Sequence, residues 1–283
     1  MDIVSSYPPP IYVNHEIIHN SYVVKMFERK WVIFESNLDA IPMGWLIVIS
    51  AHGTGPSYFQ ELRKRGLRWI DATCPLVEKV HREARNYINK GYHILYIWKK
   101  WHQEALWVID EGSLHFTLIE KKEDLHQVDQ QLPLALLTQT TLSVDDTEVL
   151  IETAKNLFPH IVLPKTSDIC YATTNRQNAL KALAEKSDII IVVGSKNSSN
   201  SNKLKNLAES LGNTAYLVDD ARELESSWFL EGKSVWVTAW ASWPEELVEG
   251  VLEKLKEFSW IFVSEIKTTE ERMEFPYTLR IES

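Results

Sequence analysis

A cysteine in a polar stretch offers the most reactive chemistry in this chain. Cys170, one of only two cysteines, lies within residues 167–177, and a helical pattern follows through Ala184. A thiol just before a helix faces free backbone N–H groups and the positive end of the helix dipole, and both stabilise the thiolate. A thiolate binds metal or attacks an electrophile. The alternative is a small buried hydrophobe, which the polar neighbours of Cys170 disfavour.

Other polar residues follow short apolar runs of the kind that form buried parallel strands. They are His15, His52, Cys74, His102, Glu104, Thr140, Thr173, Ser198, Ser199, Asn200 and Ser242. Neutral donors of this kind, with backbone N–H groups at helix N-termini, can hold a diphosphate without a lysine cluster. Any one such turn is more often a solvated loop, but their recurrence at equivalent positions favours a shared site.

The chain repeats a strand, a polar turn and a helix in three rounds, which predicts parallel α/β units. Strands are expected at residues 11–13, 31–34, 46–50, 67–70, 93–97, 116–119, 134–137, 188–193, 215–218, 235–238 and 277–281. Helices are expected through residues 23–27, 59–65, 76–89, 144–157, 179–184 and 203–211, and after Pro244. Ligands bind such folds beyond the carboxyl ends of the strands, where the polar turns lie.

The composition is that of a soluble globular protein. The 283 residues suffice for two or three domains, and the hydrophobic content of 45% is ordinary. No apolar run is long enough to cross a bilayer, and residues 1–10 do not read as a signal peptide. The net charge of −9 argues against broad nucleic-acid binding. Two cysteines make no disulfide framework, so a cytoplasmic location is expected.

Six motifs resemble the 4-hydroxy-3-methylbut-2-enyl diphosphate reductase family, whose enzyme ends the methylerythritol phosphate route to isoprenoids. They are HEIIHN (15–20), SAHG (50–53), DATCPLV (71–77), TQTTLSVDD (138–146), ICYATTNRQ (169–177) and GSKNSSNSN (194–202). The resemblance implies three similar α/β domains with small parallel sheets, arranged around a central iron–sulfur and substrate site. We place the domains at residues 1–74, 75–166 and 167–262, with a C-terminal tail at residues 263–283.

The resemblance also implies a cofactor and a role for each site residue. Cys74 and Cys170 would be thiolate ligands of a [4Fe–4S] cluster whose fourth iron binds the allylic hydroxyl. Glu104 would deliver protons, helped by Thr140 and His102. The substrate-binding residues would be His15, His52, His102, Thr140, Thr173, Ser198, Ser199, Asn200 and Ser242.

The implied reaction is the reductive dehydration of this allylic diphosphate to isopentenyl and dimethylallyl diphosphate. Lewis-acidic iron makes hydroxide a better leaving group, and a carboxyl in a water-poor pocket can stay protonated. Ferredoxin or flavodoxin would supply the electrons, with NAD(P)H upstream.

The chain departs from the family pattern in its cysteines. The family has a third cysteine ligand in an N-terminal segment, and this chain begins after that position. The first domain is therefore expected to lack its N-terminal strand and cluster cysteine. A [4Fe–4S] cluster held by two thiolates alone is expected to bind weakly.

Tryptophans are the second departure. Glycine positions of the family are occupied by Trp98, Trp101, Trp107, Trp236 and Trp240, and by Trp31, in a chain with 10 Gly and 11 Trp. Tryptophan there should strain the turns and fill the pocket. Our hypothesis is that several of these codons are UGA and are read as glycine; UGG codons at positions 98, 101 and 240 would contradict it. A decayed paralogue is the alternative.

Three other functions compete with the reductase. The first is a cluster-less, inactive paralogue or scaffold that binds a diphosphate. The second, a thiol enzyme using Cys170 with a histidine base, lacks an accompanying Cys/His signature. The third, a zinc site, is disfavoured because no CxxC spacing occurs.

Overall fold

The computed structural model describes residues 2–15, 21–100, 102–229, 233–240, 243–258 and 281–282. The chain divides into two compact units. The first comprises Met1–Ile17, Met26–Cys170 and Glu274–Ser283, and the second comprises Ile18–Lys25 and Tyr171–Met273.

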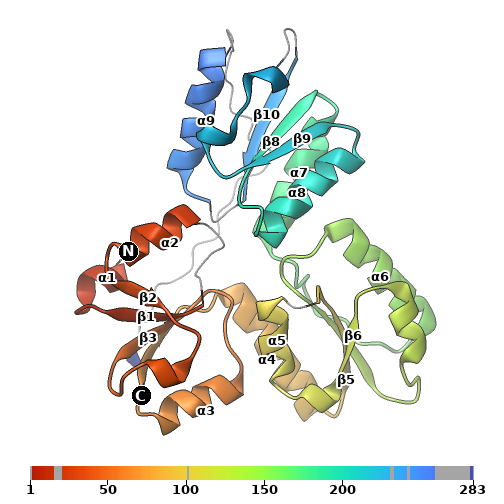
Figure 1. Ribbon diagram of the computed structural model, residues 1–283. Coiled ribbons are helices and arrows are strands. Elements are labelled where there is room, and N and C mark those ends of the chain that lie inside the picture. Colours follow the sequence, from red (N-terminus) through yellow and green to blue (C-terminus); the bar gives the residue numbers. More distant parts are fainter. Residues whose placement is uncertain are drawn as a thin grey trace. The chain divides into compact units, whose positions relative to one another are not determined.

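The first unit contains a five-stranded and a three-stranded sheet, each with helices beside it (Figure 1). Its strands are β1 (Ile11–Asn14), β2 (Val32–Phe34), β3 (Leu46–Ile49), β4 (Arg68–Asp71), β5 (His93–Ile97), β6 (Phe116–Ile119), β7 (Leu134–Thr138) and β11 (Ile281–Glu282). Its helices are α1 (Asp2–Ser6), α3 (Pro56–Lys64), α4 (Pro75–Asn89), α5 (Gln103–Ile109) and α6 (Val144–Leu157), while α2 (Ser21–Glu28) is divided between the units.

The second unit contains one three-stranded sheet. Its strands are β8 (Ile189–Val193), β9 (Thr214–Val218) and β10 (Val235–Ala239), and its helices are α7 (Tyr171–Ala184), α8 (Ser199–Ser210) and α9 (Glu245–Phe258). Short 3-10 helices also interrupt the connections of the chain, namely η1 (Leu38–Ala40), η2 (Ser113–His115), η3 (Lys122–Gln127), η4 (Ala221–Glu223) and η5 (Ser226–Trp228).

The three sheets share one strand order. The first strand of each group lies between the next two in sequence, giving the orders β11-β4-β3-β1-β2, β6-β5-β7 and β10-β8-β9. All pairs are parallel except β11 with β4. The strand order therefore reverses beside β1, β5 and β8. The carboxyl ends of these central strands are the switch points at which α/β sheets open a crevice for ligands.

Alternating residues of each central strand pack against helices on opposite faces. In β8, Ile190 and Val192 pack with residues of α7 and α8, whereas Ile191 and Val193 pack with residues of α9. Successive side chains of a strand point to opposite faces, so a sheet covered on both sides needs a continuous apolar run. The run IIIVV in β8 meets this need, and its five residues are all buried.

The predicted fold class is confirmed, since the chain is α/β with small parallel sheets. The predicted bounds of β5, β6 and α6 match the observed ones, whereas α5 was not expected. Each predicted domain range contains one sheet, with β11 of the tail paired to β4; the domain limits themselves stay a prediction. Residues 277–280 of the last predicted strand lie outside the described residues.

The prediction that α8 begins at residue 203 is wrong, because the helix begins at Ser199. The preceding residue, Ser198, has extended backbone and accepts a hydrogen bond from the N–H of Ser201. Serine is a preferred N-cap, so it starts the helix within a polar run that resembles a loop. The correction places Ser199 and Asn200 in the first turn of a helix.

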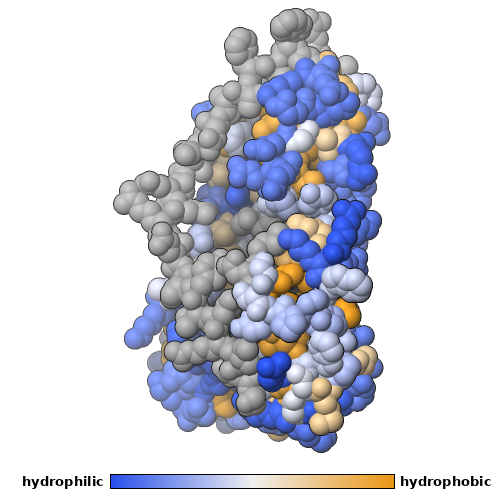
Figure 2. All heavy atoms as spheres, turned by 90° about the vertical axis from the view of Figure 1, so that its left-hand side faces the viewer, coloured by the Kyte–Doolittle hydropathy of each residue, from blue (hydrophilic) through white to orange (hydrophobic). Residues whose placement is uncertain are grey.

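The surface is mixed in character. Figure 2 shows a face on which hydrophilic residues predominate and hydrophobic residues occupy smaller areas between them. Among the residues that the structure describes, no helix has the length and apolar character that crossing a membrane requires.

Among the residues that the structure describes, two other than glycine have left-handed backbone, and one of them is Trp31. Its φ is +63° and its side chain is 71% exposed. A side chain in this conformation brings Cβ too close to the neighbouring carbonyl, at a cost of about 1–2 kcal/mol. Trp98, Trp107, Trp236 and Trp240 instead pack against the cores, and Trp101 lies outside the described residues.

We predict that Trp31→Gly stabilises the protein. Glycine removes the Cβ contact, and the greater freedom of glycine in the unfolded chain offsets part of the gain, leaving about 0.5–1 kcal/mol. Urea unfolding followed by far-UV circular dichroism measures the change. Trp31→Ala removes the ring but keeps Cβ and should bring no such gain. An equal gain in both variants would show that the exposed ring, not the backbone, is responsible.

Candidate active site

The predicted site residues lie in the polar turns at the carboxyl ends of the strands, or beside those turns. In the first unit these are His15, His52, Cys74, His102, Glu104, Thr140 and Cys170, and in the second they are Thr173, Ser198, Ser199 and Asn200. Ser242 lies outside the described residues. His15 directly follows β1, and Gly194 directly follows β8, so the turns at these two switch points begin with motif residues.

Glu104 and Thr140 form a buried pair. Glu104 Oε1 accepts a hydrogen bond from the backbone N–H of Thr140 at 2.7 Å, and Oε2 lies 2.9 Å from Thr140 Oγ1. The two residues are 2% and 3% exposed. A buried carboxyl without hydrogen bonds is costly, because nothing replaces the water that it has lost. The carboxyl of Glu104 is therefore held in the orientation that keeps both bonds. The structure thus brings the predicted proton donor and its predicted helper together.

His52 and His102 lie close to each other in the first unit. Their ring centroids are 6.2 Å apart, and His102 is the N-cap residue of α5, two residues before Glu104. The turn that carries His52 needs glycine at the next position. Gly53 has a φ of +77°, and a Cβ there would lie 3.1 Å from Thr73 and 3.4 Å from His81 Nε2.

His15 is the second residue with left-handed backbone, at a φ of +64°. Strain of this kind persists where the surroundings hold a residue in place, as at ligand sites. Its ring centroid lies 6.0 Å from that of Trp107. Burial lowers the pKa of His15 below its ordinary value, which favours the neutral ring. A neutral ring can both donate and accept a hydrogen bond.

Two buried polar atoms near His15, on Asn14 and Ser50, have no hydrogen-bond partner among the described residues. Asn14 and Ser50 are 0% and 2% exposed, and the Oδ1 atom of Asn14 accepts a hydrogen bond from the N–H of Ser50 at 2.6 Å. Within the described part of the chain, Asn14 Nδ2 and Ser50 Oγ make no hydrogen bond. Buried polar atoms are usually satisfied, so these two are available to a ligand or to water.

Each cysteine is tied by its backbone to another motif. Cys74 is the N-cap residue of α4, and its N–H donates to the carbonyl of Ala51, next to His52, at 3.1 Å. Cys170 directly precedes α7, and its N–H donates to the carbonyl of Thr140 at 2.8 Å. Both thiols are unbridged and partly exposed. Both directly precede helices, so each lies beside the backbone N–H groups of a first helical turn.

The donor set suits iron in part. Thiolates are the ligands of iron–sulfur clusters, and the chain contains two. The described residues include no group of three His, Cys, Asp or Glu side chains placed to hold a metal ion. The two thiols therefore fit two positions around a cluster, and the described residues add no third ligand to them.

The predicted residues of the second unit lie at helix starts. Thr173 is buried in the first turn of α7, and Ser198, Ser199 and Asn200 begin α8. The turn before α8 is tight, because a Cβ on Gly194 would lie 2.2 Å from Ser201 Oγ. The free N–H groups of a helix start are suited to anions.

Sequence reasoning missed the buried polar residues that hold these turns. Gln139 is fully buried, and its Oε1 accepts the N–H of Lys99 at 3.0 Å, which fixes the turn before His102. Its Nε2 donates to Thr141 Oγ1 at 3.1 Å. His81 is 2% exposed and bonds Glu111 through Nδ1 at 2.7 Å. The sequence did contain a signal for these residues: Gln139 directly follows an apolar strand, and His81 lies on the apolar face of a helix.

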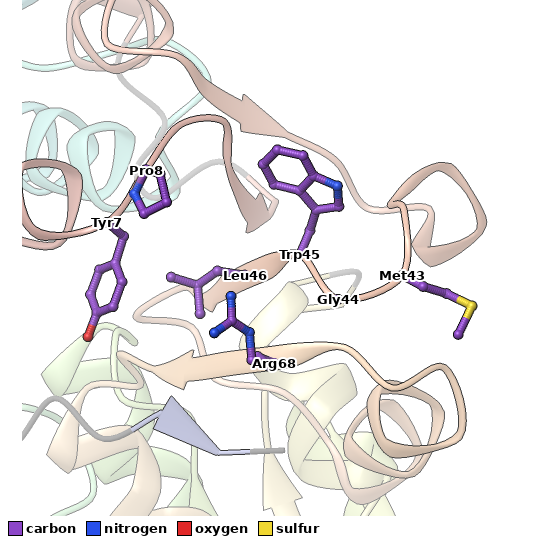
Figure 3. Close-up of a pocket in the computed structure, with 7 residues that line it drawn as sticks. All are labelled: Tyr7, Pro8, Met43, Gly44, Trp45, Leu46 and Arg68. Atoms are coloured by element: carbon purple, nitrogen blue, oxygen red, sulfur yellow. The ribbon is translucent and has the colours of Figure 1, made fainter.

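A cavity of about 270 Å³ lies elsewhere (Figure 3). It is lined by Tyr7, Pro8, Met43, Gly44, Trp45, Leu46 and Arg68. Leu46 and Arg68 begin β3 and β4. This cavity therefore lies at the amino ends of these strands, the opposite edge from the polar turns, and we exclude it from the site.

Comparison with known proteins identifies the family. The family model described as LytB protein matches residues 1–256. A 4-hydroxy-3-methylbut-2-enyl diphosphate reductase from Aromatoleum aromaticum is 45% identical over 269 residues, which cover 94% of this chain and 86% of that protein. A reductase of the same name from Pseudomonas putida is 43% identical over 285 residues, which cover 97% and 90% of the two chains.

Solved structures agree with these relatives. The E-1-hydroxy-2-methyl-but-2-enyl-4-diphosphate reductase from Plasmodium falciparum has a TM-score of 0.87 at 35% identity, over 90% of this chain and 81% of that one. A structure of (E)-4-hydroxy-3-methyl-but-2-enyl diphosphate reductase, described as the terminal enzyme of the non-mevalonate pathway, has a TM-score of 0.67 at 28% identity, over 90% and 91%. On this similarity over nearly its whole length, the chain belongs to the LytB protein family.

Proposed function

We propose that this chain catalyses the reductive dehydration of 4-hydroxy-3-methylbut-2-enyl diphosphate to isopentenyl and dimethylallyl diphosphate. The reaction takes up two electrons and two protons and releases the allylic hydroxyl as water. The observation that carries the proposal is the buried Glu104–Thr140 pair, together with the hydrogen bond that the backbone N–H of Cys170 donates to the carbonyl of Thr140. Relatives named as reductases of this substrate favour this reaction over a cluster-less diphosphate-binding paralogue.

Cys74 and Cys170 would hold the [4Fe–4S] cluster that the family uses. When bound, the cluster supplies electrons to the allylic alcohol and a Lewis-acidic iron to its hydroxyl. Each cysteine directly precedes a helix, and the thiolate is the form that would bind iron. The backbone N–H of each cysteine also donates a hydrogen bond to a residue that follows a strand, Ala51 for Cys74 and Thr140 for Cys170.

Glu104 would give a proton to the leaving hydroxyl. Its carboxyl is shielded from water, and its orientation is set by both bonds to Thr140. Because Thr140 Oγ1 lies 2.9 Å from Oε2, the hydroxyl of Thr140 would accept this proton and pass its own to the leaving hydroxyl. His102 lies two residues before Glu104 and close to His52, where it would bind substrate and pass protons.

The diphosphate would be bound by neutral donors. His15 and His52 follow strands of the first unit, and Ser198, Ser199 and Asn200 begin α8 in the second. Thr173 and Ser242 complete the proposed set. Hydrogen bonds from neutral donors and helix N–H groups compensate a diphosphate without lysines. Ferredoxin or flavodoxin is the proposed electron donor. A reducing cytoplasm is the proposed location, since Cys74 and Cys170 form no disulfide.

We predict that Glu104→Gln lowers kcat by about 10²–10⁴-fold, the range for loss of a general acid, with little change in KM. Glutamine keeps the shape of the side chain and an acceptor for the N–H of Thr140. Product formation is measured by mass spectrometry under anaerobic conditions with a chemical reductant. Glu148→Gln, on the exposed face of α6, is the matched control. A Glu104→Gln variant that keeps the wild-type kcat would remove Glu104 from the mechanism.

We also predict that Cys74→Ser and Cys170→Ser each lose most of the iron that the wild-type chain takes up on anaerobic reconstitution with iron and sulfide. Serine leaves no thiolate for iron, so the visible sulfur-to-iron absorption should fall in parallel. Met43→Ser removes a sulfur from an 81% exposed side chain and should change neither quantity. A wild-type chain that takes up no iron would contradict the proposed cofactor.

A further inference from the structure

Lys79 links the two proposed thiolate ligands. It lies on α4, five residues after Cys74, and its side chain is 16% exposed. Its ammonium donates to three acceptors of a single segment, the carbonyls of Thr166 and Ser167 at 2.9 and 3.0 Å and Asp168 Oδ1 at 2.9 Å. Lysine has three N–H donors, and these three acceptors can use all of them. The segment they belong to leads directly into Cys170.

The same segment is held from a second side by β7. The side chain of Asp168 is fully buried, and its Oδ2 accepts the N–H of Thr138 at 3.0 Å. Two residues later, the N–H of Cys170 donates to the carbonyl of Thr140. Cys170 is thus attached to the end of β7 by its own backbone, while Lys79 joins the segment before it to α4. Two further residues of α4 lie along the same segment: Glu83 beside Lys79 and Asp168, and Tyr87, whose hydroxyl donates to the carbonyl of Leu163 at 3.4 Å.

These contacts do more than add stability. Without the lysine, the buried Asp168 carboxyl loses its cation, which favours movement of the segment toward water. Such a movement would displace Cys170, whereas Cys74 is held separately by its bond to Ala51. Residues that orient metal ligands typically contribute about 10- to 100-fold to metal affinity.

We propose that Lys79 is a positioning residue that fixes Cys170 relative to Cys74, so that both thiolates bind one cluster. This inference rests on the proposed role of these two cysteines as ligands. It assigns Lys79 a place in the site although the side chain carries no predicted catalytic or substrate-binding role.

The experiment compares the full-length wild type with Lys79→Met, Lys79→Arg and the control Lys155→Met. Lys155 lies on α6, is 42% exposed and pairs only with Glu152 among the described residues. The first readout uses the metal-free protein. The alkylation rates of Cys74 and Cys170 by iodoacetamide are measured separately by peptide mass spectrometry, with far-UV circular dichroism to verify folding.

In Lys79→Met, Cys170 should be alkylated several-fold faster than in the wild type, while the rate at Cys74 stays the same. Lys79→Arg keeps the charge and should restore part of the protection. Equal acceleration at both cysteines, or none, would overturn the proposal. If Lys79→Met does not fold, Asp168→Asn takes its place, since the amide retains the shape and an acceptor, and the same selective acceleration at Cys170 is required of it.

The second readout uses protein reconstituted anaerobically with iron and sulfide. Cluster loss to an iron chelator should be about 10- to 100-fold faster in Lys79→Met than in the wild type or in Lys155→Met. An unchanged rate of loss would contradict the positioning role. A wild type without iron, combined with selective acceleration at Cys170, would instead reject the proposed cofactor and leave Lys79 as the residue that orders Cys170.

Discussion

Parallel strands impose the constraint on which this site depends. Strands that run in one direction end at one edge of the sheet, and each connection must leave from that edge. Because the first strand of each group is central, the connections diverge on either side of it. The backbone between them is left without strand partners, so polar side chains gather there. Strand order therefore determines where the site lies, and the particular residues determine what it can bind.

Polar turns need their own support, because sheet hydrogen bonds stop where the strands end. Backbone bonds from Cys74 and Cys170 to neighbouring turns provide part of this support. Buried side chains provide the rest, with Gln139 holding the turn before His102 and Asp168 holding the N–H of Thr138. The charges of these buried carboxyl groups are compensated locally, since Asp168 pairs with Lys79 and Glu111 pairs with Arg85. Burial still raises the pKa of Asp168 above its ordinary value.

The parts of the fold set by local pattern were predictable from the sequence, and those set by distant contacts were not. β5, β6 and α6 have sharp apolar patterns or caps, and their bounds were predicted correctly. The start of α8 was missed because one serine cap outweighs a run of poor helix formers. The site residues were proposed from motifs, but Lys79 was not, since its partner Asp168 lies 89 residues away in the chain. The periodicity of apolar residues along a chain predicts local structure, and it cannot predict a contact between residues so far apart in sequence.

The last described strand of the chain has a consequence for handling the protein. β11 pairs antiparallel with β4, so Ile281 and Glu282 cover an edge of the five-stranded sheet that would otherwise offer unpaired N–H and C=O groups. Open edges recruit strands from other molecules and start aggregation. A purification tag or a deletion at residues 281–282 would uncover β4, the strand that leads to Cys74. Affinity tags are therefore better placed away from residues 281–282, so that β11 stays paired with β4.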